Sequence, residues 1–386
     1  MKENKIILID LNMTGFGHFE FNKNVINHIS KNRSMIFFGE SKLVDILFKN
    51  CIYKNNIKFN KFFFPDANSK IKLLFREILA IIYITLIFIS LSSRKKTIEF
   101  YFLSVIPLTH FYVKLINVFF SYKVTIFLHG ELEAFKKQTN LPSFKYYYSI
   151  ACKAIKIFNN YFKYIVLGES IFKNLNKIIN TENISFIDHP YSYDEIFHIE
   201  KTNKVISFGS VGKAIIGEKN SHLIFKLADF IRNNNVSNID NSKFTIVGTL
   251  SKDLHSYAND YVDFKEQSGM LSDVEFETRI LTLDFILFFY NSDSYKYTAS
   301  GAFFDCIKYE IPFIAIKNDF FNYYQEKYGP IGYLEDDYES IEKRILLILN
   351  ASEEDKLNEI KVFKNNLKTM KASLKKHTNN FFENIK

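Results

Sequence analysis

The sequence predicts an α/β protein of two domains, each built around a parallel sheet. Short apolar runs typical of buried strands alternate with longer segments typical of helices, and this alternation occurs twice along the chain. A polar stretch at residues 191–203 separates the two series. In addition, a chain of 386 residues is too long for one ordinary core.

The first series fills residues 1–190. Its expected strands are residues 5–10, 34–39, 57–64, 97–104, 123–128, 164–167 and 184–187. Its expected helices lie at about residues 18–29, 41–50, 70–92, 105–121 and 143–158, and from residue 170. This order predicts a parallel sheet with helices on both faces.

The second series occupies residues 204–370, after the linker at 191–203. Its expected strands are residues 204–208, 244–248, 261–264, 285–290 and 311–316. Helices are expected at residues 221–233, from Ser272 with a capping box to Glu275, after Ser300, at 338–349 and from 353. We expect residues 371–386 to return as a helix toward the first domain. Eight of the 13 glycines follow residue 208, as a phosphate-binding domain requires.

Cysteine usage and the N-terminus indicate the compartment. The three cysteines, Cys51, Cys152 and Cys306, have no metal-ligand spacing and fit a reducing cytoplasm. The first residues lack the apolar core of a signal peptide and lead directly into a strand. We therefore expect a cytoplasmic protein.

Positive charge gathers in the first half. Residues 1–200 hold 26 Lys and Arg against 16 Asp and Glu, net +10, whereas residues 201–386 are net −2. The most apolar segment, residues 78–91, also lies there, and its 14 residues fall short of the ~20 that span a bilayer. Its basic neighbours are Lys70, Lys72, Arg76, Arg94, Lys95 and Lys96.

Two interpretations of this segment remain open. It is either a buried core helix or a helix in a membrane interface, where basic side chains meet anionic lipid. The basic residues form no known nucleic-acid reader motif, so we expect no nucleic-acid partner.

The stretch at residues 297–315 carries the clearest sign of a binding site. Ser300 and Gly301 stand at the entrance of an expected helix, and Asp305 follows one turn later. Free N–H groups at a helix start favour a phosphate, and a carboxylate one turn further in can hold a ribose hydroxyl. These residues predict a sugar-nucleotide site, although an ordinary strand-to-helix connection is the alternative.

Four segments in order resemble the donor domain of GT-B glycosyltransferases of the family 4 kind. Residues 211–220, Val-Gly-Lys-Ala-Ile-Ile-Gly-Glu-Lys-Asn, are similar to the loop Val-Gly-Arg-Leu, a spacer, then Glu-Lys-Gly. The strand that ends at Gly248 matches next, followed by residues 269–275, and residues 297–315 align without gaps. The resemblance implies two Rossmann-like domains facing a cleft. It implies that Gly212, Lys213 and Lys219 hold the diphosphate, that Gly269 and Met270 meet the nucleobase, and that Asp305 holds the ribose.

The chain departs from this pattern beside the donor sugar. The first family glutamate falls on Tyr297, which cannot replace a carboxylate, and the second falls on Asp305. Similarity to the family implies retention of anomeric configuration, but Tyr297 leaves retention or inversion open and allows an inactive relative. In this chain the segment reads Thr-Ala-Ser-Gly at residues 298–301, with a later Asp, and this form resembles transferases of bacterial capsule and O-antigen clusters.

Candidates in the first domain lie at strand ends, where open α/β sheets bind ligands. His129 follows an expected strand, and Glu131 or Glu133 behind it could be a general base. Gly15 and Gly17 could bring backbone close to donor or acceptor, and His18 begins the next helix. The alternatives are a loop-capping histidine, solvated carboxylates and tight-turn glycines.

These residues predict a membrane-associated glycosyltransferase. It would transfer a UDP- or GDP-linked sugar to a glycan acceptor, such as a polyprenyl-linked glycan, in surface polysaccharide synthesis at the inner face of the membrane. No metal or other cofactor is expected, because there is no Asp-x-Asp motif behind apolar residues and Asp336-Asp337 reads as a surface pair. Alternatives are a transferase with a small acceptor, an epimerase of the same two-domain type and a non-catalytic binding subunit.

Overall fold

The structure is a computed structural model that describes residues 5–15, 18–65, 69–93, 98–135, 150, 152–157, 159–180, 182–193, 205–234, 241–265 and 271–385. The chain divides into two compact units. The first comprises Met1–Ser192, Tyr297–Ala299 and Lys376–Lys386, and the second comprises Tyr193–Lys296 and Ser300–Lys375. Each unit contains one parallel sheet, so the predicted fold class is confirmed.

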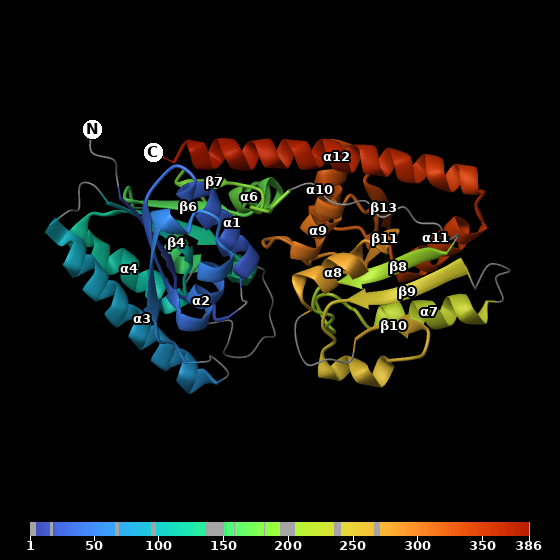
Figure 1. Cartoon of the computed structure of the whole chain (residues 1–386), viewed down its shortest axis with the longest axis horizontal. Helices are drawn as coiled ribbons and strands as arrows, with labels where there is room; N and C mark the ends of the chain where they lie inside the picture. Colours follow the sequence, from blue (N-terminus) through green and yellow to red (C-terminus); the bar gives the residue numbers. More distant parts are fainter. Residues whose placement is uncertain are drawn as a thin grey trace. The chain divides into compact units, whose positions relative to one another are not determined.

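The first unit holds a 7-stranded sheet in the order β3-β2-β1-β4-β5-β6-β7 (Figure 1). The chain builds outward from β1 to β3, and then returns to place β4 beside β1. Ligands of open α/β sheets bind where the order reverses in this way, at the carboxyl ends of β1 and β4. The strands are β1 (Lys5–Asp10), β2 (Met35–Glu40), β3 (Ile57–Phe62), β4 (Ile98–Ser104), β5 (Lys123–Leu128), β6 (Phe162–Val166) and β7 (Ile184–Phe186).

Helices cover both faces of this sheet, because alternate strand residues point to opposite sides. Ile7 and Ile9 of β1 belong to one core, with residues of α3 and α4. Ile6 and Leu8 belong to the other, with residues of α1 and α2 and, from the end of the chain, Phe382 and Ile385. The helices are α1 (Phe19–Ser30), α2 (Ser41–Asn50), α3 (Lys70–Leu91), α4 (Pro107–Phe120) and α6 (Glu169–Asn176).

The second unit holds a 6-stranded sheet in the order β10-β9-β8-β11-β12-β13, which reverses between β8 and β11. Its strands are β8 (Ile206–Val211), β9 (Ser242–Val247), β10 (Val262–Asp263), β11 (Phe285–Phe288), β12 (Phe313–Ile316) and β13 (Gly332–Glu335). Its helices are α7 (Leu223–Asn233), α8 (Asp273–Ile280), α9 (Gly301–Tyr309), α10 (Asp319–Tyr328), α11 (Tyr338–Asn350) and most of α12 (Glu353–Glu383).

Three elements of the second unit differ from the sequence prediction. Strand β8 runs on to Val211, so Gly209 lies inside the strand, where Leu283 leaves no room for a side chain. Helix α10 and strand β13 were not expected, because α10 mixes aromatic and polar residues and β13 is only four residues long. Residues 143–149 of one expected helix and 194–203 of the expected linker lie outside the described residues.

Helix α3 has nearly the bounds expected for residues 70–92, and its apolar stretch extends beyond residues 78–91. It has 22 residues, and in the part of the chain that the structure describes, Ile71–Leu91 is the one stretch long and apolar enough to cross a membrane, with a mean hydropathy of 2.2. A core helix would pass the same test, yet only 33% of its most apolar window is buried. Arg94, Lys95 and Lys96, the basic residues that follow the apolar segment, lie outside the described ranges.

Candidate functional site

The loops after β8 and β9 are held together by two glycines. Gly212 has a φ of +86°, and its N–H donates to the carbonyl of Val247 at 2.8 Å. Gly248 has a φ of +154°, and a Cβ there would lie 1.9 Å from the carbonyl oxygen of Gly212. A side chain at 248 would therefore separate the two loops, which explains glycine at this position.

The loop that carries Lys219 is fixed by the loop after β11. Asn220 has a left-handed backbone, and its Nδ2 donates to the carbonyl of Phe289 at 3.0 Å and to Oδ1 of Asn291 at 2.7 Å. The hydroxyl of Ser294 donates to the carbonyl of Glu218 at 3.2 Å. Together with the bond from the Asn291 side chain to the carbonyl of Gly217, these bonds hold residues 217–220 against the carboxyl end of β11. The sequence did not single out these three polar residues, because their partners lie about 70 residues away.

Lys219 is thereby brought to Gly212 and Asp305. Its Nζ lies 3.5 Å from the position that a Cβ on Gly212 would take. Burial lowers the pKa of Lys219, while the charges of Asp305 and Glu218 act in the opposite direction. Lys213 is exposed, and its charge lowers the pKa of Lys219 further. Two lysines and one buried carboxylate thus share this end of the sheet.

Helix α9 begins as predicted, with Ser300 as its N-cap. The Ser300 hydroxyl accepts a hydrogen bond from the N–H of Phe303 at 3.4 Å and shares another with the hydroxyl of Tyr290 at 3.1 Å. No atom of the described residues lies within 4 Å of the position that a Cβ on Gly301 would take, so this helix start is open. Asp305 lies one turn in and is 9% exposed. The arrangement can accept a phosphate at the helix start.

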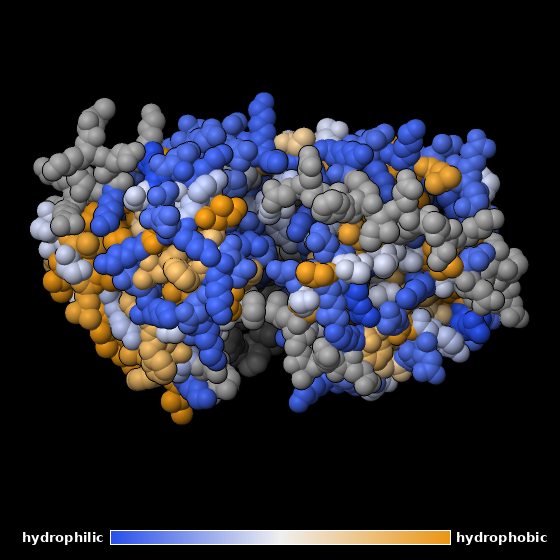
Figure 2. All heavy atoms as spheres, viewed as in Figure 1, coloured by the Kyte–Doolittle hydropathy of each residue, from blue (hydrophilic) through white to orange (hydrophobic). Residues whose placement is uncertain are grey.

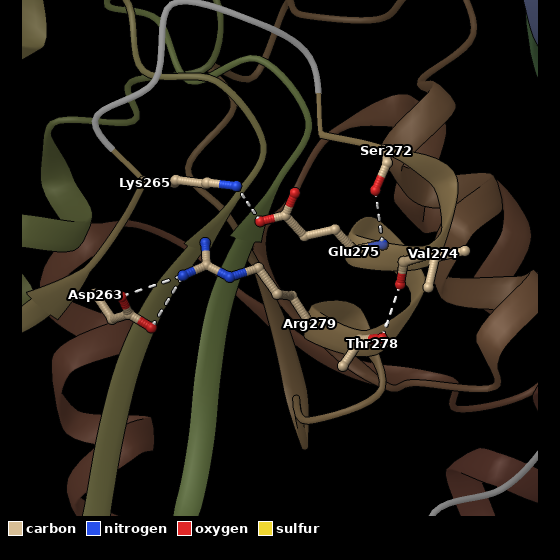
Figure 3. Close-up of polar contacts among 7 residues, drawn as sticks. All are labelled: Asp263, Lys265, Ser272, Val274, Glu275, Thr278 and Arg279. Atoms are coloured by element: carbon tan, nitrogen blue, oxygen red, sulfur yellow. Dashed lines mark hydrogen bonds and ion pairs between the residues drawn. The ribbon is translucent and has the colours of Figure 1, made fainter.

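The segment expected to meet a nucleobase is described only from residue 271, so Gly269 and Met270 lie outside the described residues. Helix α8 follows it, and Ser272 accepts the N–H of Glu275 as the capping box predicts (Figure 3). The other half of the box is not formed, because the Glu275 carboxylate pairs with Lys265. Arg279 pairs with Asp263 at 3.3 Å and also ties α8 to the sheet.

In the first unit, Glu40 shapes the loop after β1. Its carboxylate accepts the N–H of Gly15 at 3.2 Å and the N–H groups of Lys42 and Leu43 at the start of α2. Gly15 has a φ of +55°, which suits a glycine. Gly17 lies outside the described residues.

Asp10, at the end of β1, joins three parts of the same region. It is fully buried, and Oδ1 accepts the N–H groups of Asn12 and Met13 and the hydroxyl of Ser104 at the end of β4. Its Oδ2 accepts from the side chain of Asn22 on α1 at 2.6 Å. Sequence reasoning missed Asp10, although a carboxylate ending an apolar strand is a usable signal.

Three histidines and one phenylalanine gather at the carboxyl ends of β5 and β7. The His18 and His129 rings are stacked, and the ring of Phe21 makes T-shaped contacts with those of His129 and His189, with centroid distances of 4.7 Å and 5.4 Å. Nε2 of His129 is 2.8 Å from the carbonyl of Leu103, so this nitrogen carries the proton. The structure thus brings together the predicted His18 and His129 and adds His189, which the sequence did not single out.

Burial keeps these histidines neutral and makes Glu131 easier to protonate. It lowers the pKa of His18, although Asp10 opposes it, and it lowers the pKa of His129 well below the usual value, with help from His18 and His189. It also lowers the pKa of His189 to about 4. Conversely, burial raises the pKa of Glu131 to about 7. Glu131 accepts the N–H of His129 through Oε2 at 2.9 Å, while Oε1 is buried and has no hydrogen-bond partner among the described residues.

Tyr297 is grouped with the first unit. Its N–H donates to Oε1 of Glu133 at 3.1 Å, and its ring is 6% exposed, 6.4 Å from the ring of Phe135. The position where the family pattern has a glutamate therefore holds a buried tyrosine, and the backbone N–H of this tyrosine binds the carboxylate of Glu133. Glu133 comes from the η3 turn (Gly130–Phe135), so its proximity could not be anticipated from residues 297–315 alone.

Two other features have no part in this site. Asp336 pairs with Lys317 at 2.7 Å and Asp337 caps α11, and within the described ranges no three His, Cys, Asp or Glu are placed to hold a metal ion. A cavity of about 650 Å³ lies at the amino ends of β8, β11 and β13, lined by Ile206, Phe285 and Tyr333 among others. Ligands of such sheets bind at the opposite, carboxyl edge, so we assign this cavity no ligand.

Two Rossmann-like units, each with a reversal in strand order, define the GT-B fold of glycosyltransferases. No family model and no curated protein sequence matches the chain. Among solved structures, it resembles Anabaena Alr3699/HepE in complex with UDP and glucose, with a TM-score of 0.65, 11% identity, and coverage of 99% of this chain and 100% of that one. It also resembles WaaG, a glycosyltransferase involved in lipopolysaccharide biosynthesis, with a TM-score of 0.63, 11% identity, and coverage of 98% and 99%. A glycosyltransferase from Rickettsia africae matches with a TM-score of 0.60, 13% identity and complete coverage of both chains.

Proposed function

We propose that this protein is a glycosyltransferase that moves a sugar from a nucleoside-diphosphate sugar to a glycan acceptor. The observation that carries the proposal is the position of Lys219, held beside Gly212 and influenced electrostatically by Asp305. Negative charge grows on the departing diphosphate as the glycosidic bond breaks, and preorganised cations and N–H groups stabilise it. Lys219, Lys213 and the open start of α9 are suited to this task, and Asp305 to a ribose hydroxyl.

The donor would be a UDP- or GDP-linked sugar. Structures similar to this chain hold UDP or UDP-glucose, which favours UDP. In this proposal Gly248 keeps the two donor loops in contact, and Gly269 and Met270 meet the base. The family 4 likeness suggests a retaining reaction without a metal or other cofactor, with Tyr297 as the departure that makes the stereochemistry worth measuring.

Acceptor binding is assigned to residues 1–190 and donor binding to residues 204–370. Glu131 is the candidate general base, because a carboxyl group with a pKa of about 7 can take a proton near neutral pH. His129, His18 and the backbone around Gly15 and Gly17 would shape the acceptor side. The acceptor we favour is a lipid-linked glycan of capsule or O-antigen type, which would place the enzyme at the anionic inner face of the cell membrane.

Two other functions are compatible with the same fold. An epimerase would use the donor site with water and no acceptor, and a binding subunit would hold the nucleotide without turnover. Product analysis separates them: an epimerase converts UDP-sugar without an acceptor, and a binding subunit releases no UDP.

A thermal-shift panel of UDP, GDP, CMP, dTDP and their sugars tests the donor site. We expect one nucleotide to raise the melting temperature of the wild type, and Lys219→Ala and Asp305→Ala to abolish this shift. Lys252→Ala, at an exposed position of the same unit, is the control and should respond like the wild type. No shift with any nucleotide would contradict the proposal.

A further inference from the structure

Helix α3 exposes an apolar stripe along its whole length. Its exposed large side chains recur every three or four residues, as one face of a helix requires. Among the exposed side chains described on α3, only Lys72 and Ser90 are polar, one near each end. The stripe consists of Ile71, Leu74, Phe75, Ile78, Ile82, Leu86 and Ile89.

Helix α4 continues this surface. Every exposed side chain on α4 is apolar, namely Phe111, Leu115, Val118 and Phe119. The one lysine of α4, Lys114, points inward, where its ammonium group donates to the carbonyl of Ala154 at 2.6 Å. Figure 2 shows hydrophobic residues gathered along the side of the first unit where Figure 1 draws α3. We call these eleven residues of α3 and α4 the apolar face.

The two helices are locked together, so the apolar face is one surface. Glu77 of α3 is buried, and its carboxylate accepts the N–H groups of Leu108 and Thr109 at the start of α4, both at 2.9 Å. The hydroxyls of Thr85 and Tyr112 share a hydrogen bond of 2.7 Å. A carboxylate at a helix N-terminus is a favourable contact, so neither helix is expected to move alone.

The inner side of α3 shows that the helix lies on the unit and does not span a bilayer. Arg76 is buried, and its guanidinium donates to the carbonyls of Leu11 and Asn12 in the loop after β1. Ala80, Ile84 and Phe88 belong to the core of the first unit. A spanning α3 would bring Arg76 and Glu77 into hydrocarbon without these partners, which is strongly unfavourable.

We propose that the apolar face docks flat into the interfacial region of an anionic bilayer. An exposed surface of this extent without charged groups marks an interaction site. The net charge of +10 on residues 1–200 suits an anionic lipid surface, and Lys72 stands beside the stripe to meet headgroups. Since Arg76 holds the loop after β1, docking would set the height of the Gly15 loop above the bilayer. This inference rests on the lipid-linked acceptor of the proposed function and names the surface that serves it.

Vesicle flotation of the full chain tests the proposal. We expect the wild type to bind vesicles of phosphatidylcholine with 30% phosphatidylglycerol better than phosphatidylcholine alone, and less tightly in high salt. Ile82→Glu on α3 and Leu115→Glu on α4 should each weaken partitioning about tenfold or more. Val362→Glu, at an exposed apolar position on α12, is the control and should bind like the wild type. Unchanged melting temperatures would show that the variants are folded.

Environment-sensitive labels on single cysteines distinguish the modes of binding. The native cysteines are buried, so labels can be directed to Leu74→Cys, Ile82→Cys, Ile89→Cys and Leu115→Cys. Flat docking predicts equal, shallow depths at all four positions. A deeper label at Ile82 than at Leu74 and Ile89 would indicate a spanning helix and overturn the proposal.

Three further results would also overturn it. The first is a Leu115→Glu variant that binds vesicles as tightly as the wild type does. The second is a wild type that binds no vesicles. The third is a wild-type dimer that the Leu115→Glu substitution dissociates, which would assign the apolar face to a second copy. The nucleotide shift is measured on the same variants and should be unaffected. If vesicle binding is lost while UDP still raises the melting temperature, the result bears on the apolar face alone. If vesicles are bound but no nucleotide raises the melting temperature, only the proposed transferase function is contradicted.

Discussion

The imidazole ring of His18 lies stacked on that of His129, with ring centroids 4.2 Å apart and 26° between the planes. The two residues come from the start of α1 and the end of β5. Two charged imidazoles at this distance would repel each other, so the stack requires at least one neutral ring. Burial lowers the pKa of both, which favours a neutral pair at pH 7.

The histidine cluster should make the protein sensitive to acid. His189 has a folded-state pKa of about 4, below the 6.5 of an unfolded chain, so the unfolded state binds protons first as the pH falls. Its stability contribution is complete above pH 6.5 and is lost between 6.5 and 4, by about 3 kcal/mol at most. Melting temperatures from pH 8 to 4 should fall less for His189→Gln than for the wild type. Equal slopes would contradict the assignment, and His255→Gln, at an exposed histidine, serves as the control.

Glu131 has the opposite pH dependence. Its folded-state pKa of about 7 exceeds the 4.5 of an unfolded glutamate, so its stability contribution is present below pH 4.5 and is lost as the pH rises to 7. Glu131→Gln should therefore raise the free energy of unfolding at pH 8 by about 1–3 kcal/mol and have less effect at pH 4.5. If Glu131 is the general base, the same variant loses sugar transfer. A variant that is more stable and fully active would exclude that role.

The open start of α9 allows an effect on nucleotide binding to be tested apart from an effect on stability. A Cβ at position 301 would meet no atom of the described residues. Gly301→Ala should therefore leave the free energy of unfolding unchanged or raise it by up to about 1 kcal/mol. A methyl group there would obstruct a phosphate, so we expect a weaker shift with the stabilising nucleotide. Calorimetric titration measures the difference. An unchanged Kd would mean that the diphosphate does not approach this backbone.

Asn220 is expected to act through the position of Lys219. Asn220→Ala removes two hydrogen bonds and leaves a left-handed backbone without its tolerant side chain, at a cost of about 1–3 kcal/mol. Asn220→Gly keeps the backbone conformation and should cost less. Both should weaken nucleotide binding, whereas Asn234→Ala, which removes one exposed hydrogen bond at the C-cap of α7, should not. Normal binding by Asn220→Ala would show that the loop is held without these contacts.

The elements whose signal is local could be predicted from the sequence. Strands β1 and β5 and helix α2 have the expected bounds, because apolar runs between polar ends specify buried strands and the alternation specifies the helices. Ser300 was correctly expected at the start of α9, since an N-cap acts on residues within one turn. Helix α10 and strand β13 were missed because neither has a clear apolar period.

The surroundings of the site residues could not be predicted in the same way. Asp10, His189 and Asn220 act through partners on other loops, and a contact between distant loops leaves no periodic pattern in the sequence. The raised pKa of Glu131 likewise depends on burial by the surrounding fold.

By itself the sequence determined the α/β class, the two series of strands and the residues that end them, because hydrophobic period and turn residues act over short distances. Only the tertiary structure decided which ends meet and which apolar surfaces stay uncovered. Helix α3 is apolar around most of its circumference, so its sequence does not say which side faces the core. Packing against β1 and β4 buried Ile84 and Phe88, and left Ile82 and Leu86 exposed beside the apolar side of α4.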